Sequence, residues 1–237
     1  MLTIVTWVWR DGGPRAYTLE HAAALAAGFR RHLSKPHRFV CLTDDVRHVE
    51  GIDVKPIPQA AAECGQWRTP EAGRFPSCYR RLWMFSEEAA ALGQRLLLVD
   101  VDALVTGSVD HLTDRSEDFV GWRPRATWGN PCRLGGGLYL LTAGSRRQVW
   151  DRFTGPASIG AARAAGFRGS DQAWLSFCLG ADAASWPHDS GVYSVRDLRN
   201  PVATPPPDAC LIQFNGPTKP WTARWPWVRE HYCGPGL

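Results

Sequence analysis

The sequence predicts a single α/β domain with a mostly parallel central sheet flanked by helices. In the first half of the chain, apolar segments of strand length alternate with segments of helical periodicity, as in parallel sheets with crossover helices. Residues 96–105 form an almost continuous apolar run, which is typical of a strand buried on both faces. A length of 237 residues is enough for one such domain with a sizeable core.

In the first half, strands alternate with helical segments. We expect strands at Leu2–Trp9, Arg38–Thr43 and Ile52–Ile57, helices at Tyr17–Leu33 and 79–92, and irregular structure at 59–78. The second helix leads directly into the apolar run 96–105. This order predicts right-handed crossovers between parallel strands.

In the second half, the elements are more widely spaced. We expect strands at Phe119–Arg123 and Leu138–Leu141, helices at Ser145–Phe153 and Asp171–Leu179, and loops over most of the last third. The second of these strands is entered through the glycines 135–137. No internal repeat or low-complexity linker divides the chain.

Composition excludes several classes of protein. Hydrophobic residues make up 44% and charged residues 21%, and the formal charge of +4 is spread without a basic stripe, so we expect no nucleic-acid partner. No segment reaches the length of a membrane span. Seven scattered cysteines without a Cys-x-x-Cys pair predict reduced thiols, and we expect a cytoplasmic protein with at most peripheral contact at the inner membrane face.

Asp100 and Asp102 are the most informative residues because they interrupt the apolar run 96–105. An unpaired carboxylate in a core is costly, so both residues are expected where the strand ends and meets a cleft. On an extended chain, residues two apart point to the same side. Two such carboxylates predict a Mg²⁺ or Mn²⁺ site, and the alternative is a cap or a salt-bridged turn after a core strand.

The predicted topology places other loops beside these aspartates. The loops that follow Trp9, Thr43 and Val99 all leave the carboxyl ends of strands. In open α/β sheets, ligands bind at this edge. The order of strands therefore favours a metal–nucleotide site over a simple cap.

Four sequence blocks carry a family resemblance. They are Leu-Val-Asp-Val-Asp (98–102), Gly-Gly-Gly-Leu-Tyr-Leu-Leu (135–141), Gly-Ser-Asp-Gln-Ala-Trp (169–174) and Ile-Gln-Phe-Asn-Gly-Pro-Thr-Lys-Pro-Trp (212–221). In this order, the set resembles the GT-A glycosyltransferases, especially the family 8-like enzymes that use nucleotide sugars. The resemblance extends from Met1 to about Trp221. It implies one GT-A domain, with a nucleotide-binding half at about 1–105 and an acceptor-side half at about 106–237.

The resemblance assigns the donor diphosphate and its metal to particular residues. Asp100 and Asp102 match the D-x-D motif that holds Mn²⁺ or Mg²⁺ against the diphosphate of the nucleotide sugar. Lys219 matches a lysine that contacts the diphosphate, and Gly216 would let the backbone approach the phosphates.

The sequence departs from the family where a histidine often provides the third metal ligand. Gln213 and Asn215 occupy the two positions where relatives carry it. An amide oxygen can bind a hard cation more weakly than imidazole binds Mn²⁺, so Gln213 is the candidate ligand and a water the alternative. His188 lies elsewhere in the sequence, and we expect a structural role for it.

Asp171 and Gln172 match an Asp-Gln pair that faces the donor sugar in similar enzymes. The alternative for Asp171 is a helix cap, because Ser170 and Asp171 stand just before a helical pattern. Arg80 or Arg81 matches an arginine near the donor phosphate or sugar, and the sequence does not distinguish the two.

The resemblance places the nucleoside after the first two strands. Thr6, Trp7 and Trp9 lie in the corresponding part of the first strand, and alternation predicts that one tryptophan packs inward. Asp44, which ends the second strand, is expected to accept hydrogen bonds from uracil or ribose.

These matches predict a metal-dependent glycosyltransferase that moves a hexose from UDP to a glycan, lipid or small-molecule acceptor, with retention of anomeric configuration by family analogy. Two alternatives are a sugar-1-phosphate nucleotidyltransferase and a nucleotide-sugar-binding protein with weak catalysis. The first needs a Gly-rich basic loop after the first strand, which 10–15 only partly imitates. Acceptor contacts are expected from the loops 59–78, 123–134 and 181–208.

Overall fold

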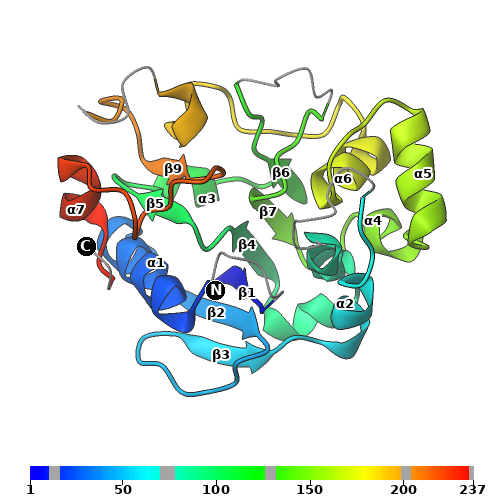
Figure 1. Cartoon of the computed structure of the whole chain (residues 1–237), viewed down its shortest axis with the longest axis horizontal. Coiled ribbons are helices and arrows are strands. Elements are labelled where there is room, and N and C mark those ends of the chain that lie inside the picture. Colours follow the sequence, from blue (N-terminus) through cyan, green and yellow to red (C-terminus); the bar gives the residue numbers. More distant parts are fainter. Residues whose placement is uncertain (11–16, 70–77, 126–131, 199–203, 235–237) are drawn as a thin grey trace.

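A six-stranded sheet runs through the centre of the computed structural model (Figure 1). Its strands, in spatial order, are β3 (Asp53–Pro56), β2 (His37–Thr43), β1 (Leu2–Val8), β4 (Arg95–Val99), β7 (Leu138–Thr142) and β6 (Phe119–Gly121). The structure describes residues 1–10, 17–69, 78–125, 132–198 and 204–234. Parts of the predicted acceptor loops, at 70–77, 126–131 and 199–203, therefore lie outside the described residues.

The strand directions confirm the predicted, mostly parallel sheet. The neighbours β3, β2, β1 and β4 are all parallel, whereas β7 is antiparallel to both β4 and β6. The carboxyl ends of β1, β2 and β4 consequently lie along one edge of the sheet. This is the edge at which the sequence predicts a ligand site.

Helices cover both faces of this sheet. The α-helices are α1 (Leu19–His32), α2 (Gln59–Cys64), α3 (Asp110–Thr113), α4 (Gln148–Asp151), α5 (Pro156–Ala164), α6 (Asp171–Leu179) and α7 (Pro226–His231), and the 3₁₀ helices are η2 (Cys78–Phe85), η3 (Glu88–Leu92) and η4 (Val195–Asp197). Figure 1 shows α1 and α7 on one side of the sheet and α2, α4, α5 and α6 on the other. None of the described helices has the length and apolar character needed to cross a bilayer.

Two apolar clusters hold these layers together. On one face, Leu25 and Phe29 of α1 pack with Ile4 and Leu97 of the sheet. On the other face, residues of η2, η3, α4 and α6 pack with Val5 and the same sheet. No disulfide joins any of the seven cysteines, which all lie among the described residues, so none contributes to the core.

A second sheet was not predicted. It contains β5 (Ala103–Val105), β9 (Leu211–Gln213) and β8 (Val192–Ser194), with β5 antiparallel and β8 parallel to β9. The apolar run 96–105 is therefore two strands in two sheets, joined by a turn in which the Ala103 N–H donates to the Asp100 carbonyl at 3.0 Å. The expectation of an extended chain through Asp100 and Asp102 was wrong, because β5 leaves the first sheet to pair with β9.

The predicted helix at 79–92 is two 3₁₀ helices, η2 and η3. Tyr79, Leu82 and Phe85 are fully buried at a spacing of three residues, which matches the three-residue turn of a 3₁₀ helix better than the 3.6-residue turn of an α-helix. The segment expected to be irregular begins with α2. The Ala-rich α5 was also missed, although its Gly155-Pro156 start is a recognisable helix signal.

Candidate functional site

The turn Asp100–Asp102 lies where the two sheets meet. Its two ends are β4 and β5, and the pairing of Ala103 with Gln213 brings the end of β9 beside it. The Phe214 N–H donates to the Asp102 carbonyl at 3.1 Å, which continues this pairing by one residue. The D-x-D motif and the C-terminal block, more than a hundred residues apart in sequence, are thus neighbours through main-chain hydrogen bonds.

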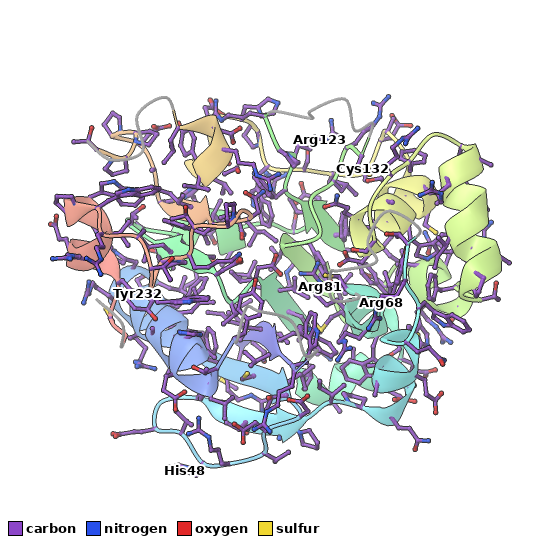
Figure 2. The ribbon with its side chains drawn as sticks, viewed as in Figure 1. His48, Arg68, Arg81, Arg123, Cys132 and Tyr232 are labelled. Atoms are coloured by element: carbon purple, nitrogen blue, oxygen red, sulfur yellow. The ribbon has the colours of Figure 1, made fainter. Side chains whose placement is uncertain are left out.

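Arg81 joins two carboxylates at this turn. Its Nε donates to Asp171 Oδ2 at 2.8 Å, its Nη2 lies 2.7 Å from the same oxygen, and its Nη1 donates to Asp100 Oδ1. Arg81 and Asp171 are 6% and 4% exposed, so the pair is shielded from water. Figure 2 shows Arg81 near the centre of the molecule.

The charges of this cluster depend on one another. Burial raises the pKa of Asp171, and the Arg81 guanidinium opposes that effect. Burial likewise disfavours the charge on Arg81, yet Asp100 and Asp171 raise its pKa well above the usual range. The charged form of each group is therefore opposed by burial and favoured by its partner.

Lys219 forms a second buried ion pair with Asp102. Its Nζ donates to Asp102 Oδ2 and, at 2.9 Å, to the Phe214 carbonyl. The hydroxyl of Tyr17 lies 3.5 Å from the same carboxylate oxygen. Burial raises the pKa of Asp102, and the ammonium of Lys219 counteracts it.

Aromatic stacking holds the segment that carries Lys219. The ring of Trp221 lies 3.7 Å from the ring of His21 at an angle of 10°, and Tyr17 meets Trp221 edge-on at 5.8 Å. His21 belongs to the first turn of α1, and its Nδ1 accepts from the Thr18 N–H at 3.0 Å. The segment 214–221 is consequently anchored on α1 at one end and on the Asp100–Asp102 turn at the other.

The glycines before β7 make room for the carboxylates. A Cβ on Gly137 would lie 2.4 Å from Asp100 Oδ2, and a Cβ on Gly136 would lie 2.8 Å from Asp171 Oδ2. The Gly137 carbonyl also accepts from the Asp100 N–H at 2.8 Å and from Gln213 Nε2 at 3.2 Å. Glycine is therefore required here for close approach, a role that the triple glycine could have indicated.

The two carboxylates predicted to bind the metal each have one oxygen atom that is not used by Arg81 or Lys219. In the described part of the chain, Asp100 Oδ2 and Asp102 Oδ1 have no hydrogen-bond partner, because Arg81 and Lys219 each use only the other oxygen. Gln213 is 1% exposed and its amide nitrogen is bound to the Gly137 carbonyl. Two carboxylate oxygens and a nearby amide are hard donors of the kind that Mg²⁺ and Mn²⁺ prefer, so the residues fit such a cation.

The third candidate ligand of the cation, Gln213, is an uncharged amide. Among the described residues, no group of three or more His, Cys, Asp or Glu side chains is arranged to hold a metal. Asn215, the other candidate position, is exposed and accepts a hydrogen bond from Ser194 Oγ at 2.7 Å. His188 is exposed and its main-chain carbonyl accepts from Arg125 Nη2, and the structural role expected for its ring stays a prediction.

The structure brings Arg81, not Arg80, to the carboxylates. The guanidinium of Arg80 lies over the Trp9 ring, 4.5 Å from its centroid, and against Gly65. Consecutive residues of a 3₁₀ helix point about 120° apart, so only one of the two can face Asp100. Of the two arginines that the sequence does not distinguish, Arg81 is therefore the candidate for the donor site, and Arg80 contacts Trp9 instead.

The residues predicted to contact the nucleoside separate into two groups. Thr6 and Trp7 are buried at 0% and 4% exposure, and Trp7 packs edge-on against Trp83 at 6.3 Å. Trp9 is partly open at the carboxyl end of β1, and the exposed Asp44 accepts from the Arg10 N–H at 2.9 Å. Trp9 and Asp44 thus lie at the expected edge, and Trp7 is the tryptophan that packs inward.

The Asp-Gln pair begins α6. Ser170 is the N-cap residue and Asp171 the first helical residue, so the capping alternative for Asp171 is wrong, and its carboxylate pairs with Arg81 instead. Gln172 is half-buried beside Gly169, where a Cβ would lie 2.7 Å from its Nε2. Gly136 brings the entry of β7 against Asp171 from the other side.

Gly216 lies in the anchored segment with open space beside it. Among the described residues, a Cβ there would meet only Arg196 Nε, at 3.8 Å. Three site features were not predicted: the contact of Tyr17 with Asp102, the stack of His21 on Trp221, and the steric role of the glycines. Each depends on contacts between segments far apart in the chain.

Solved structures with this fold are glycosyltransferases. The galactosyltransferase LgtC, solved with donor and acceptor sugar analogues, is 15% identical, and the match covers 96% of this chain and 93% of LgtC with a TM-score of 0.66. GlyE of Streptococcus pneumoniae is 13% identical over 94% of this chain and 57% of its own, with a TM-score of 0.59. The bifunctional glycosyltransferase WbbM is 12% identical over 97% of this chain and half, 50%, of its own, also at 0.59.

Sequence comparisons find no such relative: no family model matches, and no curated protein matches. At these identities the structural likeness establishes the fold. The chain therefore has the single-domain α/β fold of the GT-A glycosyltransferases, as the sequence predicts.

The buried ion pairs predict unequal effects for two adjacent arginines. Arg81→Met leaves Asp171 buried without its cation, and we expect a loss of about 3–5 kcal/mol in the free energy of unfolding, measured in urea. Arg80→Met removes the contact with Trp9 and is expected to cost about 1–2 kcal/mol. Equal losses in the two variants would contradict the proposed difference in their environments.

The stack on Trp221 predicts a pH effect at His21. Burial lowers the pKa of His21 from 6.5 to about 4, so between these values the unfolded chain binds a proton that the folded chain does not. The stability that neutral His21 contributes is present above 6.5 and falls as pH is lowered toward 4. We expect the stability difference between the parent and His21→Gln to shrink over this window. A difference between the parent and His21→Gln that stays constant over this window would exclude the effect.

Proposed function

We propose that the protein is a glycosyltransferase that moves a hexose from a nucleoside diphosphate sugar, a UDP-sugar, to a glycan, lipid or small-molecule acceptor in a reaction that depends on Mn²⁺ or Mg²⁺. The observation that supports it most is the buried network in which Arg81 and Lys219 neutralise Asp100, Asp102 and Asp171. This network lies at the carboxyl edge of a glycosyltransferase fold. LgtC, solved with donor and acceptor sugar analogues, makes the same class of substrates reasonable here.

Lys219 binds the diphosphate in this proposal. Its ammonium is buried and already faces an anion, Asp102, so a diphosphate entering the site provides an alternative anionic partner. Gly216 lies three residues earlier with free space at its Cα, which allows phosphate oxygens to approach the backbone. The stack of Trp221 on His21 keeps this segment in place while Lys219 changes partner.

Asp100, Asp102 and the amide of Gln213 hold the divalent cation. When bound, the cation supplies Lewis acidity that neutralises the diphosphate as it leaves the sugar. Lys219 already neutralises Asp102, so a cation at Asp102 would compete with its ammonium. We therefore expect nucleotide and metal to bind together, because Lys219 can then pair with the diphosphate.

Asp171 and Gln172 face the donor sugar. Arg81 fixes the Asp171 carboxylate with two contacts to Oδ2, which leaves Oδ1, bound by Ser170, directed to another side. A buried, ionised carboxylate can accept from sugar hydroxyls and stabilise positive charge that develops at the anomeric carbon. We assign retention of configuration, in which the leaving diphosphate accepts the acceptor proton, on family analogy.

The nucleoside lies across Trp9 and Asp44. Trp9 already accepts the Arg80 guanidinium on one face of its ring, so a base would use the remaining exposed surface of this side chain. The carboxylate of Asp44 is exposed at the end of β2 and can accept from uracil or ribose. Seven cysteines that form no disulfide support the proposed cytoplasmic location, with peripheral membrane contact for a lipid acceptor.

Release of UDP tests the proposal. We expect the parent to release UDP from at least one UDP-hexose with Mn²⁺ or Mg²⁺, slowly with water alone and faster with an acceptor. Asp102→Asn should reduce this rate at least 100-fold, because the cation loses a charged ligand and Lys219 its counter-ion. The exposed Asp114→Asn, which lies outside the site and the predicted acceptor loops, should retain the parental rate.

Other outcomes separate the alternatives. Pyrophosphate release from UTP and a sugar 1-phosphate would identify a nucleotidyltransferase instead. Binding of UDP-sugars without release of UDP under any acceptor condition would indicate a binding protein. Equal rates for Asp102→Asn and the parent would disprove the assigned metal site.

A further inference from the structure

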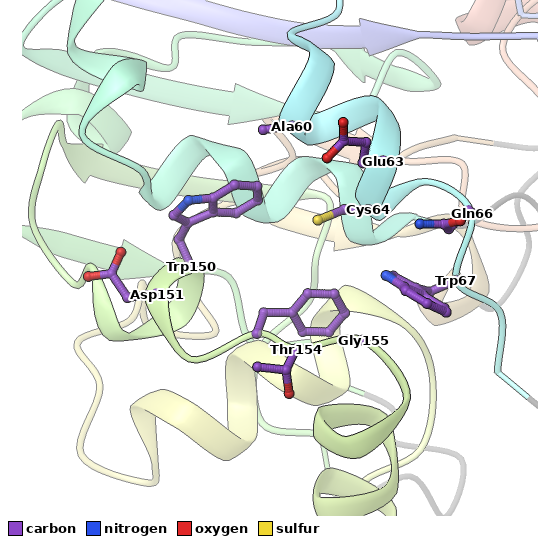
Figure 3. Close-up of a pocket in the computed structure, with 10 residues that line it drawn as sticks. Ala60, Glu63, Cys64, Gln66, Trp67, Trp150, Asp151, Thr154 and Gly155 are labelled. Atoms are coloured by element: carbon purple, nitrogen blue, oxygen red, sulfur yellow. The ribbon is translucent and has the colours of Figure 1, made fainter.

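A cavity outside the carboxylate site lies between α2 and the α4–α5 connection. It measures about 430 Å³, within the range of about 300–1,000 Å³ typical of small-molecule sites. Figure 3 shows Trp150 on one side and Trp67 on the other, with Glu63 and Cys64 of α2 between them and Gln66 beside Trp67. None of these residues takes part in the proposed donor site.

The aromatic walls of this cavity are held rigidly. Phe153 also lines it, and this ring stacks on Tyr79 at 5.0 Å and meets Trp174 edge-on at 5.6 Å. Trp67 lies flat against Gly155, where a Cβ would be only 2.6 Å from the indole. Gly155 has a φ of +71°, a value that side-chain-bearing residues rarely adopt, so the position is doubly suited to glycine.

The polar groups of the cavity offer both donors and acceptors. The Glu63 carboxylate accepts from Gln59 Nε2 at 3.1 Å, and Asp151 pairs with Arg147 at 3.2 Å. Because both carboxylates already have partners, the cavity is a poor trap for a cation. In the described part of the chain, neither indole N–H of Trp67 and Trp150 donates a hydrogen bond, and the exposed Gln66 adds an amide.

This combination matches the chemistry of a pyranose ring. Such a ring presents C–H groups on its faces, which pack on aromatic rings, and hydroxyl groups on its rim, which both donate and accept hydrogen bonds. A purely apolar ligand would offer no hydrogen bond to the Gln66 amide or to the indole N–H groups of Trp67 and Trp150. A cationic ligand would have to compete with Gln59 and Arg147.

We propose that this cavity is an accessory subsite that binds a pyranose unit of a glycan acceptor, away from the sugar that reacts. The inference rests on the proposed glycosyltransferase function. The cavity is connected to the donor side through Gly65, which precedes Gln66 and Trp67 and contacts Arg80 beside Trp9. A subsite here would retain an extended acceptor by units distant from the reacting hydroxyl.

Binding can be measured without donor or metal. Saturation-transfer NMR with lactose, maltose and N,N′-diacetylchitobiose as probes is expected to show binding of at least one disaccharide to the parent protein. Trp150→Ala and Trp67→Ala should each weaken that binding at least tenfold. Trp225→Ala, which removes a partly buried tryptophan of a different cluster, serves as the matched control and should leave it unchanged.

Kinetics provide the second readout. With oligosaccharide acceptors, we expect Trp150→Ala to raise the acceptor KM at least fivefold, while the rate of UDP-sugar hydrolysis by water stays at the parental value. If melting temperatures show that an alanine variant does not fold, Glu63→Gln and Gln66→Ala, both at exposed positions, replace it and should weaken disaccharide binding severalfold.

The subsite is overturned if no probe binds, if binding is equal in the variants and the parent, or if tetramethylammonium binds in place of the sugars. Failure of the proposed function looks different, because it would abolish UDP release from every nucleotide sugar while the donor-free NMR measurement remains interpretable.

Discussion

The pairing of two buried cations with three carboxylates is the interaction on which the rest of the site depends. Asp171 and Asp102 are buried, and Asp100 is close enough to raise the pKa of both. Without Arg81 and Lys219, such a cluster would protonate or unfold, because desolvation of a carboxylate costs several kcal/mol. Arg81 and Lys219 favour the charged form of Asp171 and Asp102 at the edge of the sheet, where we propose that a nucleoside diphosphate and its cation bind.

The architecture around this cluster follows from the need to bring its members together. Arg81 comes from a 3₁₀ helix before β4, the aspartates from the turn after it, and Lys219 from a segment anchored on α1. The turn exists because β5 pairs with β9 in a second sheet. Gly136 and Gly137 allow β7 to enter without colliding with the carboxylates.

Local patterns were sufficient to predict much of the fold. The core strands β1 and β2 and the helix α6 were predicted close to their observed bounds, because apolar periodicity and caps act over a few residues. The split of the run 96–105 was not predictable in this way, since it depends on pairing with residues 211–213. Short strands such as β8 leave no periodic signal of their own.

The site residues also divide into those that local sequence predicts and those that depend on contacts between distant segments. Asp100, Asp102, Asp171 and Lys219 were identified from sequence blocks, and the structure brings all four into one charge network. The choice between Arg80 and Arg81 required the 3₁₀ geometry of η2, which an assumed α-helix does not reproduce. The contact of Tyr17 with Asp102 and the stack of His21 on Trp221 join segments far apart in the chain, so no local sequence pattern predicts them.

The role of the charge network is tested most directly by diffraction from crystals of the protein grown with UDP and Mn²⁺, with data collected at the manganese absorption edge. We expect an anomalous difference peak at the carboxylates of Asp100 and Asp102, with Lys219 Nζ moved from Asp102 to the diphosphate. A nucleotide bound elsewhere, or no manganese at these carboxylates while both ion pairs remain intact, would contradict the assignment.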